Sequence, residues 1–198
     1  MKMIERLYGL YELMNLATKR AAAVEAYIFV SNNVDCSLPQ NEYLEMSYGA
    51  LVESALLNCA ALFDRAKYGK ENNCSFKQII YYCKKLEGKE KERYNSFVSR
   101  LEKLCSDFDS AFPSRIRNKL LAHKDLHELF RHEIIPIKIS GIKEVLVKGY
   151  SIISEMFEVT VGAHPKPFDF DEIVEKYKKS LLSIADCANN NLEREVTI

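Results

Sequence analysis

The chain has 198 residues, of which 47% are hydrophobic and 28% are charged, so it can bury a core of its own and is not compositionally disordered. Lysine plus arginine and aspartate plus glutamate both number 28, and this zero net charge excludes a protein that wraps a long nucleic-acid duplex through a general basic excess. With only 7 glycines and 5 prolines, the sequence favours helices over the many tight turns of a β-sandwich.

The cysteines and the hydropathy pattern indicate a cellular compartment. The six cysteines form no C-x-x-C pair, and a chain of this size needs no disulfide framework; they are Cys36, Cys59, Cys74, Cys83, Cys105 and Cys187. The first residues run straight into a charged amphipathic pattern, and no run of about 18 apolar residues follows. We therefore expect a cytoplasmic protein with no membrane contact.

The first half of the chain predicts helices joined by short loops. Apolar residues recur at three- and four-residue spacing over about residues 3–31, which predicts one long amphipathic helix. A loop over 32–40 and a second helix over about 41–66 follow. Ser75 with Gln78 is a capping box that opens a third helix, and Gly88 separates it from a fourth.

The second half continues this pattern. Pro113 is expected to open a short helix, and the β-branched residues 134–139 to form a linker. Ser140 is expected to cap the next helix, and Asp169 with Glu172 resembles a capping box before the last one, with a frayed tail from about residue 189. The prediction is an all-α, antiparallel helical bundle in which residues 1–198 form a single domain.

Residues 113–132, PSRIRNKLLAHKDLHELFRH, concentrate the groups that handle phosphate and protons. Five cations stand against two carboxylates, and three of the four histidines of the chain, His123, His127 and His132, lie here. On an ideal helix Arg117 falls inside the apolar arc, where an arginine is rarely buried without a partner. Arg117 and His123 are six residues apart and share no face, so they converge only if the helix distorts or two copies of the chain supply them.

The string Arg115-Ile-Arg117-Asn118-Lys119-Leu-Leu-Ala-His123-Lys-Asp125 resembles the motif of the HEPN (higher eukaryotes and prokaryotes nucleotide-binding) superfamily, and most of all its abortive-infection AbiU-type branch. The resemblance implies a HEPN-like bundle with additional flanking helices. It also implies a homodimer that cleaves RNA without a metal or other cofactor, in a toxin or phage-defence role.

Each motif residue receives a role from the resemblance. His123 would move a proton at the ribose 2′-OH or the leaving 5′ oxygen, and Arg117 would hold the scissile phosphate. Asn118 would orient the substrate or His123, while Lys119 and Arg115 would bind neighbouring phosphates. Asp125 belongs to the same supporting set. Toxins of the superfamily that are silenced by tyrosine modification carry a Tyr after the His, which this chain lacks, so an antitoxin or regulatory protein would act differently here.

Less specific interpretations of the same residues stay open. Arg117 can form a partly buried ion pair, and His123 can be a helix-end histidine, in a non-catalytic module that dimerises and binds a protein or nucleotide. His123 and His127 have a spacing that can chelate zinc, whereas protease chemistry is excluded because His127 and His132 stand five positions apart and so lie on different helix faces. Asp64 is a candidate partner of Arg117, or simply a surface charge.

Overall fold

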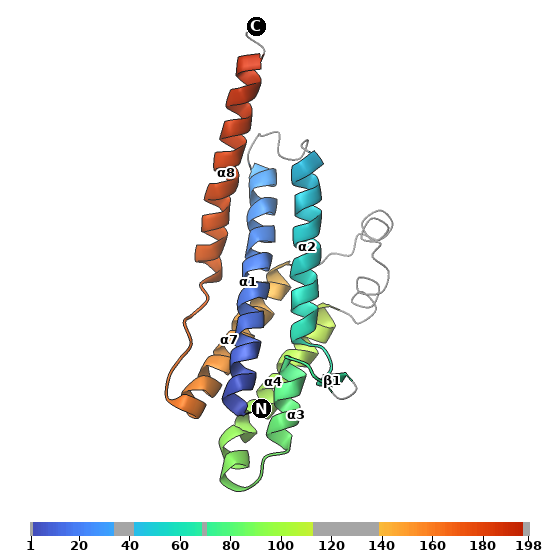
Figure 1. Ribbon diagram of the computed structural model, residues 1–198, viewed down its shortest axis with the longest axis vertical. Helices are drawn as coiled ribbons and strands as arrows, with labels where there is room; N and C mark the ends of the chain where they lie inside the picture. The colour runs from blue at the N-terminus through green and yellow to red at the C-terminus, as the bar shows by residue number, and fades with distance from the viewer. Residues whose placement is uncertain (1, 34–41, 69–70, 113–138, 196–198) are drawn as a thin grey trace.

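The computed structural model describes residues 2–33, 42–68, 71–112 and 139–195, and it is all-helical apart from one short hairpin (Figure 1). The described elements are α1 (Met3–Asn33), α2 (Glu42–Leu62), β1 (Lys67–Tyr68), β2 (Glu71–Asn72), α3 (Phe76–Lys84), α4 (Gly88–Ala111), α7 (Ile139–Val161) and α8 (Phe170–Glu195). The all-α class predicted from the sequence is therefore confirmed.

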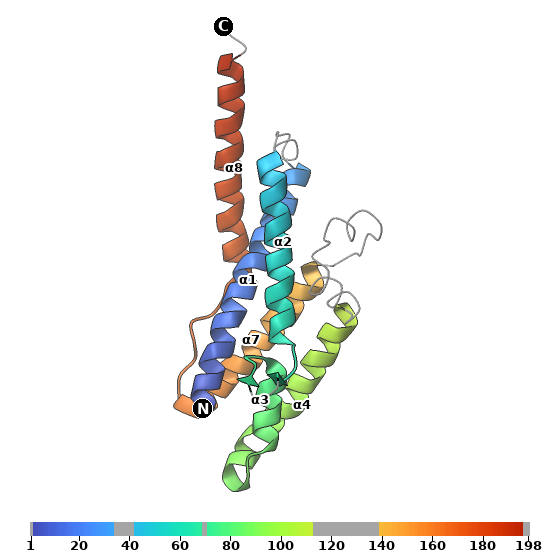
Figure 2. The same ribbon diagram turned by 45° about the vertical axis from the view of Figure 1, so that its right-hand side comes forward.

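Helix α1 is the element around which the others are arranged. Helix α2 packs antiparallel along one side of it and α8 along the other, as both views show (Figures 1 and 2). Helices α4 and α7 pack on each other; α7 crosses behind α1, whereas α4 lies against α3 (Figure 2). The far half of α8 projects beyond the ends of α1 and α2 (Figure 1).

A cluster of phenylalanines lies where α2, α3 and α4 meet. The rings of Phe63 and Phe108 stack with their centroids 3.9 Å apart, and Phe76 lies 4.9 Å from Phe63 on the other side. All three side chains are at most 1% exposed. They belong to one hydrophobic core that includes buried residues from every described helix. Fully burying large apolar side chains contributes about 1.5–3 kcal/mol each, so this cluster is a major source of stability.

Helix α7 approaches this core closely because Gly149 has no side chain. A Cβ atom at this position would lie 2.8 Å from Cζ of Phe76 and 3.3 Å from Cε of Met14. Real Cβ atoms do not approach other heavy atoms this closely, so any larger residue would push α7 outward. Gly149 therefore sets the spacing between α7 and the core.

The loop between α7 and α8 is attached to the bundle by two tyrosines. The hydroxyl of Tyr11 donates to the carbonyl of Lys166 over 3.1 Å, and the hydroxyl of Tyr150 donates to the carbonyl of Pro165 over 2.9 Å. The ring of Tyr11 also stacks on Phe168, with a centroid distance of 4.8 Å. These contacts bring the beginning of α8 back against α1.

The end of α2 differs from the sequence prediction. The helix was expected to reach about residue 66, but it ends at Leu62, and β1 then pairs with β2 in an antiparallel hairpin. Local side chains explain the difference: Asp64 accepts the Arg65 N–H over 2.7 Å, and Asn73 donates to the Arg65 carbonyl over 2.7 Å. Such bonds satisfy backbone groups outside a helix and so compete with it.

Two of the predicted helix starts are confirmed and one is wrong. Ser75 Oγ accepts the Gln78 N–H at the start of α3, and Asp169 accepts the Glu172 N–H at the start of α8. Ser140 does not cap α7, because that helix already begins at Ile139.

Helix α8 continues to Glu195, past the point where fraying was expected. Within the described ranges, no helix has the length and apolar character needed to cross a membrane.

Candidate functional site

The residues predicted to form the site lie together in one part of the chain that falls outside the described residues. This part is 113–138, and it contains Arg115, Arg117, Asn118, Lys119, His123 and Asp125. The histidine pair His123 and His127 lies there too. The roles of these residues therefore stay predictions. The structure shows the end of α4 and the start of α7, between which the segment runs.

The first of these ends, at the close of α4, is anchored by aromatic packing. Phe112 follows the last residue of α4, is 2% exposed, and its N–H donates to the Phe108 carbonyl over 2.7 Å. The two rings meet edge to face at 5.6 Å, and Phe108 in turn stacks on Phe63, the residue after the end of α2. The chain thus leaves α4 from a fixed point in the core.

The second end, at the start of α7, is anchored by apolar burial and an ion pair. Ile142 and Val145 in the first turns of α7 are buried. Lys143 Nζ lies 2.5 Å from Asp171 Oδ1 in the first turn of α8. The hydrogen bond to Asp171 is the main cause of the raised pKa of Lys143, so this lysine is a stable cation.

Helices α4 and α7 are held to each other by a two-pronged ion pair. Nη1 and Nη2 of Arg100 lie 2.5 and 2.7 Å from the two carboxylate oxygens of Glu155. These hydrogen bonds lower the pKa of Glu155 and raise that of Arg100, so both groups keep their charges. Two parallel hydrogen bonds require one relative orientation of the guanidinium and the carboxylate. The pair therefore favours one register of α4 and α7, the helices before and after 113–138.

Comparison with known proteins places this framework in a family. The family model of the AbiU2-type HEPN proteins, described as AbiU2, matches residues 9–182. The chain belongs to the AbiU2 family of HEPN proteins. No curated protein and no solved structure gives a match. The superfamily resemblance drawn from the motif is therefore confirmed.

The family match covers the region that carries the motif. Residues 9–182 extend from the first turns of α1 to the middle of α8, and they enclose the whole of 113–138. The phenylalanine anchor at Phe112 and the Arg100–Glu155 pair lie inside the match as well. The motif of this AbiU2-family protein is thus part of the family domain rather than an appendage to it.

The structure describes Asp64, a candidate partner of Arg117, whereas Arg117 lies outside the described residues. Asp64 lies two residues after the end of α2, half-exposed, with Oδ1 engaged by the N–H of Arg65. The carboxylate is therefore a turn-forming group at the end of α2. Its pairing with Arg117 involves a residue outside the described ranges and stays a prediction.

The described residues of this AbiU2-family protein include four free thiols, of which Cys74 is exposed and has a pKa raised by desolvation. Cys59, Cys83 and Cys105 are free and buried. Burial raises the pKa of the Cys59 thiol to about 12, and those of Cys83 and Cys105 to about 11, so all three are protonated at neutral pH. In the part of the chain that the structure describes, no group of histidines, cysteines and carboxylates could hold a metal ion.

The structure brings together one set of polar residues that sequence reasoning missed. Nδ1 of His164 lies 3.0 Å from Oγ of Ser154, and Nε2 lies 3.3 Å from Oε2 of Glu158. The order of groups resembles a serine–histidine–acid arrangement, but the His164 and Glu158 side chains are more than half exposed. With no walls to exclude water from it, this set is better explained as an anchor of the loop after α7.

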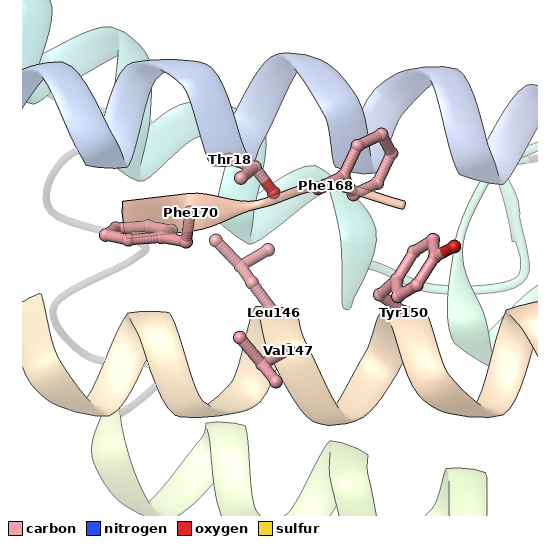
Figure 3. Close-up of a pocket in the computed structure, with 6 residues that line it drawn as sticks. All are labelled: Thr18, Leu146, Val147, Tyr150, Phe168 and Phe170. Atoms are coloured by element: carbon pink, nitrogen blue, oxygen red, sulfur yellow. The ribbon is translucent and has the colours of Figure 1, made fainter. Parts of the chain in front are cut away.

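A pocket between α1, α7 and the start of α8 is too small to bind a substrate. Figure 3 shows Thr18 of α1 and Leu146, Val147 and Tyr150 of α7 around Phe168 and Phe170. The free volume is about 30 Å³, which is room for a water molecule at most. At this pocket the rings of Phe168 and Phe170 pack the start of α8 against α1 and α7.

Proposed function

We propose that this protein is a metal-independent endoribonuclease of the toxin or phage-defence type. The proposal rests above all on the position of the Arg117–His123 motif inside a chain whose residues 9–182 belong to the AbiU2 family of HEPN proteins. Arginine supplies a permanent charge for phosphate, and histidine is the side chain whose ordinary pKa suits proton transfer near neutral pH.

The reaction is an attack of the ribose 2′-oxygen on the neighbouring phosphorus. The bond from the 2′-oxygen to phosphorus forms, the bond from phosphorus to the 5′-oxygen breaks, and the products are a 2′,3′-cyclic phosphate and a free 5′-hydroxyl. His123 accepts the proton of the 2′-OH or donates one to the departing 5′-oxygen. Arg117 stabilises the charge on the phosphate oxygens in the transition state. Asn118 orients the substrate or His123, and Arg115 and Lys119 bind the adjacent phosphates.

A composite site made by two copies of the chain follows from the spacing of the motif. Residues six apart are turned by about 120° from each other on an ideal helix, so Arg117 and His123 of one copy do not share a face. When two motifs meet across a twofold axis, Arg117 of one copy can reach the substrate beside His123 of the other. Two histidines in one site can also divide the roles of general base and general acid.

The framework around 113–138 supports this proposal. Phe112 is buried at one end of the segment, and Lys143 is ion-paired just beyond the other. The Arg100–Glu155 pair joins the helices on which both ends depend. Catalytic groups work best when rigid elements fix their attachment points. In a living host such an enzyme requires restraint, so an antitoxin or regulatory protein is the expected partner.

The proposal is tested by expressing the wild type, Arg117→Ala and His123→Ala in a bacterial host and examining total RNA on a gel. The matched control is His132→Ala, which removes a histidine of the same segment that has no assigned role. We expect growth arrest and RNA fragments with the wild type and with His132→Ala, and neither effect with the other two variants. Fragments ending in 2′,3′-cyclic phosphate, produced by purified protein in excess EDTA, would identify the metal-independent reaction.

Equal growth and intact RNA with all four proteins would contradict the proposal if the purified wild type also leaves RNA uncut. Far-UV circular dichroism of each variant shows whether a loss of activity reflects a loss of helical structure. A dimer that leaves RNA intact in these assays would favour the non-catalytic module that binds a protein or nucleotide. Sedimentation analysis of the wild type measures the dimer independently of the activity.

A further inference from the structure

A pocket beside α1 is large enough for a small molecule. Helices α2 and α8 pack on either side of α1, and a pocket of about 340 Å³ lies between the three helices (Figures 1 and 2). Ligand pockets span roughly 300–1,000 Å³, so this volume lies within their range. We call it the α1–α2–α8 pocket. Its described lining residues are Leu16, Lys19, Arg20, Ala23 and Tyr27 of α1, Leu51 of α2, and Tyr177 and Leu181 of α8.

The lining of the α1–α2–α8 pocket is mostly apolar. Leu16 and Tyr177 are 39% and 36% exposed, and Leu51 and Leu181 are half-buried. Apart from two cations, only tyrosine hydroxyls could hydrogen-bond a ligand through the described lining side chains. An alkyl chain suits such a lining, because each methylene that leaves water for an apolar surface gains free energy. A ligand rich in polar edges suits it less, because those edges would lose their hydrogen bonds to water.

Two cations add positive charge to this apolar lining. Neither Lys19 nor Arg20 takes part in the ion pairs of the described residues, and the described lining includes no carboxylate. Lys178 of α8 differs, because it lies over the ring of Phe29 and pairs with Glu175. The pocket thus combines an apolar lining with two charges that no described partner neutralises.

The spacing along α1 places the cations on either side of an apolar strip. At about 100° per residue, Leu16, Ala23 and Tyr27 fall within roughly 40° of one another on an ideal helix. Lys19 and Arg20 fall on opposite sides of this strip. Tyr27 lies roughly 10 Å along the axis from the level of the two cations. An anionic head between the cations would therefore leave an attached chain to run along the strip toward Tyr27.

We infer that the α1–α2–α8 pocket binds a single-chain amphiphile with an anionic head, such as the carboxylate of a fatty acid. Lys19 and Arg20 bind the head, and the chain lies against Ala23, Leu51 and Leu181. The described lining residues lie outside 113–138, so this site is separate from the proposed RNA-cleaving motif. The inference does not depend on the proposed ribonuclease activity.

Isothermal titration calorimetry of the full-length protein with decanoate, kept below its micelle concentration, tests the inference. We expect one saturable site and an affinity that rises about threefold to fourfold with each methylene added from octanoate to decanoate. Decyl phosphate compares the heads: tighter binding of decanoate assigns a free fatty acid, and tighter binding of decyl phosphate assigns a phosphorylated lipid. No saturable binding of either amphiphile, or an affinity that does not change with chain length, would overturn the inference.

The role of the cations is measured with the double variant Lys19→Gln/Arg20→Gln and the uncharged probe decanol. The variant should weaken decanoate binding by about tenfold or more and leave decanol binding unchanged, because decanol forms no ion pair. The matched control is Lys91→Gln/Lys103→Gln, on two exposed lysines of α4 that do not line the pocket, and it should bind decanoate like the wild type. Equal losses of decanoate affinity in the two double variants, or an equal loss of decanol and decanoate affinity in the first, would contradict the assigned role.

The role of the apolar lining is measured with Leu16→Ser. This partly exposed position tolerates a polar residue, and the variant should weaken decanoate and decanol binding alike by about threefold or more. The matched control is Val161→Ser, at a residue that is 50% exposed at the end of α7 and outside the pocket lining. If Leu16→Ser binds both probes as tightly as the wild type, the chain does not lie in this pocket and the inference fails. No RNA is involved in these measurements, so their results are independent of the ribonuclease test.

Discussion

The two halves of helix α1 are buried in different ways. The first half presents large side chains to the core, namely Met3, Leu7, Leu10 and Met14. The second half is buried mainly through small side chains, namely Ala17, Thr18, Ala21, Ala22, Ala23 and Ala26. The first half packs near the phenylalanine cluster, where several helices converge and large volumes must be filled. The second half runs between α2 and α8, where small residues allow helices to approach closely.

The difference between the halves corresponds to a difference in how tightly the space beside α1 is filled. The stacked rings near the first half fill the space between the helices, and they hold the end of α4 from which 113–138 begins. A helix lined with alanines fills less volume, and a pocket of about 340 Å³ between α1, α2 and α8, the α1–α2–α8 pocket, lies along this part of α1. One helix therefore contributes to a rigid framework at one end and to an open pocket at the other.

The largest expected effect is on the phenylalanine cluster. Phe63→Ala removes a ring that contacts both Phe76 and Phe108, and it should lower the free energy of unfolding by about 3–5 kcal/mol. The control is Phe29→Ala on the second half of α1, because Phe29 is 45% exposed and its loss should cost less than about 1 kcal/mol. Urea unfolding measures both, and equal losses would remove the contrast between the two halves.

The close approach of α7 predicts a smaller effect. Gly149→Val places atoms where Phe76 and Met14 already lie, and overpacking of this kind costs about 1–3 kcal/mol. The matched control is Gly49→Ala in α2, where an added Cβ meets nothing within 4 Å. Because alanine is the better helix former, the control should gain about 0.5–1 kcal/mol. Thermal unfolding of the two variants should therefore shift in opposite directions.

The second half of α1 can be tested in the same way. Ala22 is fully buried, so Ala22→Leu should cost about 1–3 kcal/mol through overpacking. Ala50→Leu, on the exposed face of α2, changes the same groups without burial and should be close to neutral. If Ala22→Leu unfolds at the same urea concentration as wild type, the second half of α1 is loosely packed and the comparison of the two halves fails.

The smallest effect is expected at the Arg100–Glu155 pair. Both side chains are 42% exposed, so Glu155→Gln should cost less than about 1 kcal/mol at pH 7. The pKa of Glu155 lies below its ordinary value of 4.5, so the stabilisation is present above that value and disappears as the pH falls through the pKa of the folded state. The difference in melting temperature between variant and wild type should shrink from pH 7 to pH 3. Glu144→Gln, a more exposed partner of Lys148, should show little difference at either pH.

Much of the fold was predictable because it depends on local patterns. The apolar spacing of α1, the Ser75 cap and the Asp169 cap each follow from residues within one or two turns of a helix. The end of α2 was not predictable in this way. It depends on Asn73, which bonds the Arg65 carbonyl from eight residues away, in a hairpin too short to show an alternating pattern. Tyr8 shows a limit of the apolar spacing in α1, because it is 55% exposed and its ring meets that of Phe157 edge to face.

The Arg117–His123 motif and the α1–α2–α8 pocket differ in how far the sequence reveals them. The Arg117–His123 motif is a contiguous string, so it can be recognised without a structure. The α1–α2–α8 pocket cannot, because Arg20, Leu51 and Tyr177 come from three helices whose mutual placement no local pattern encodes. Its only trace in the sequence is a pair of cations, Lys19 and Arg20, next to the alanines of α1.

The attachment of the loop between α7 and α8 has a consequence for how this region tolerates change. Tyr11 and Tyr150 bind carbonyl groups of the loop, and every amino acid supplies a carbonyl. These two bonds therefore depend on side chains of the helices and on the backbone of the loop, in contrast to the contacts of the loop's own His164 and Phe168. Replacing the side chains at residues 165 and 166 leaves both acceptor carbonyls in place, whereas replacing either tyrosine by phenylalanine removes a donor. The two loop positions whose side chains these bonds do not use thus lie directly beside the two tyrosines that hold the loop.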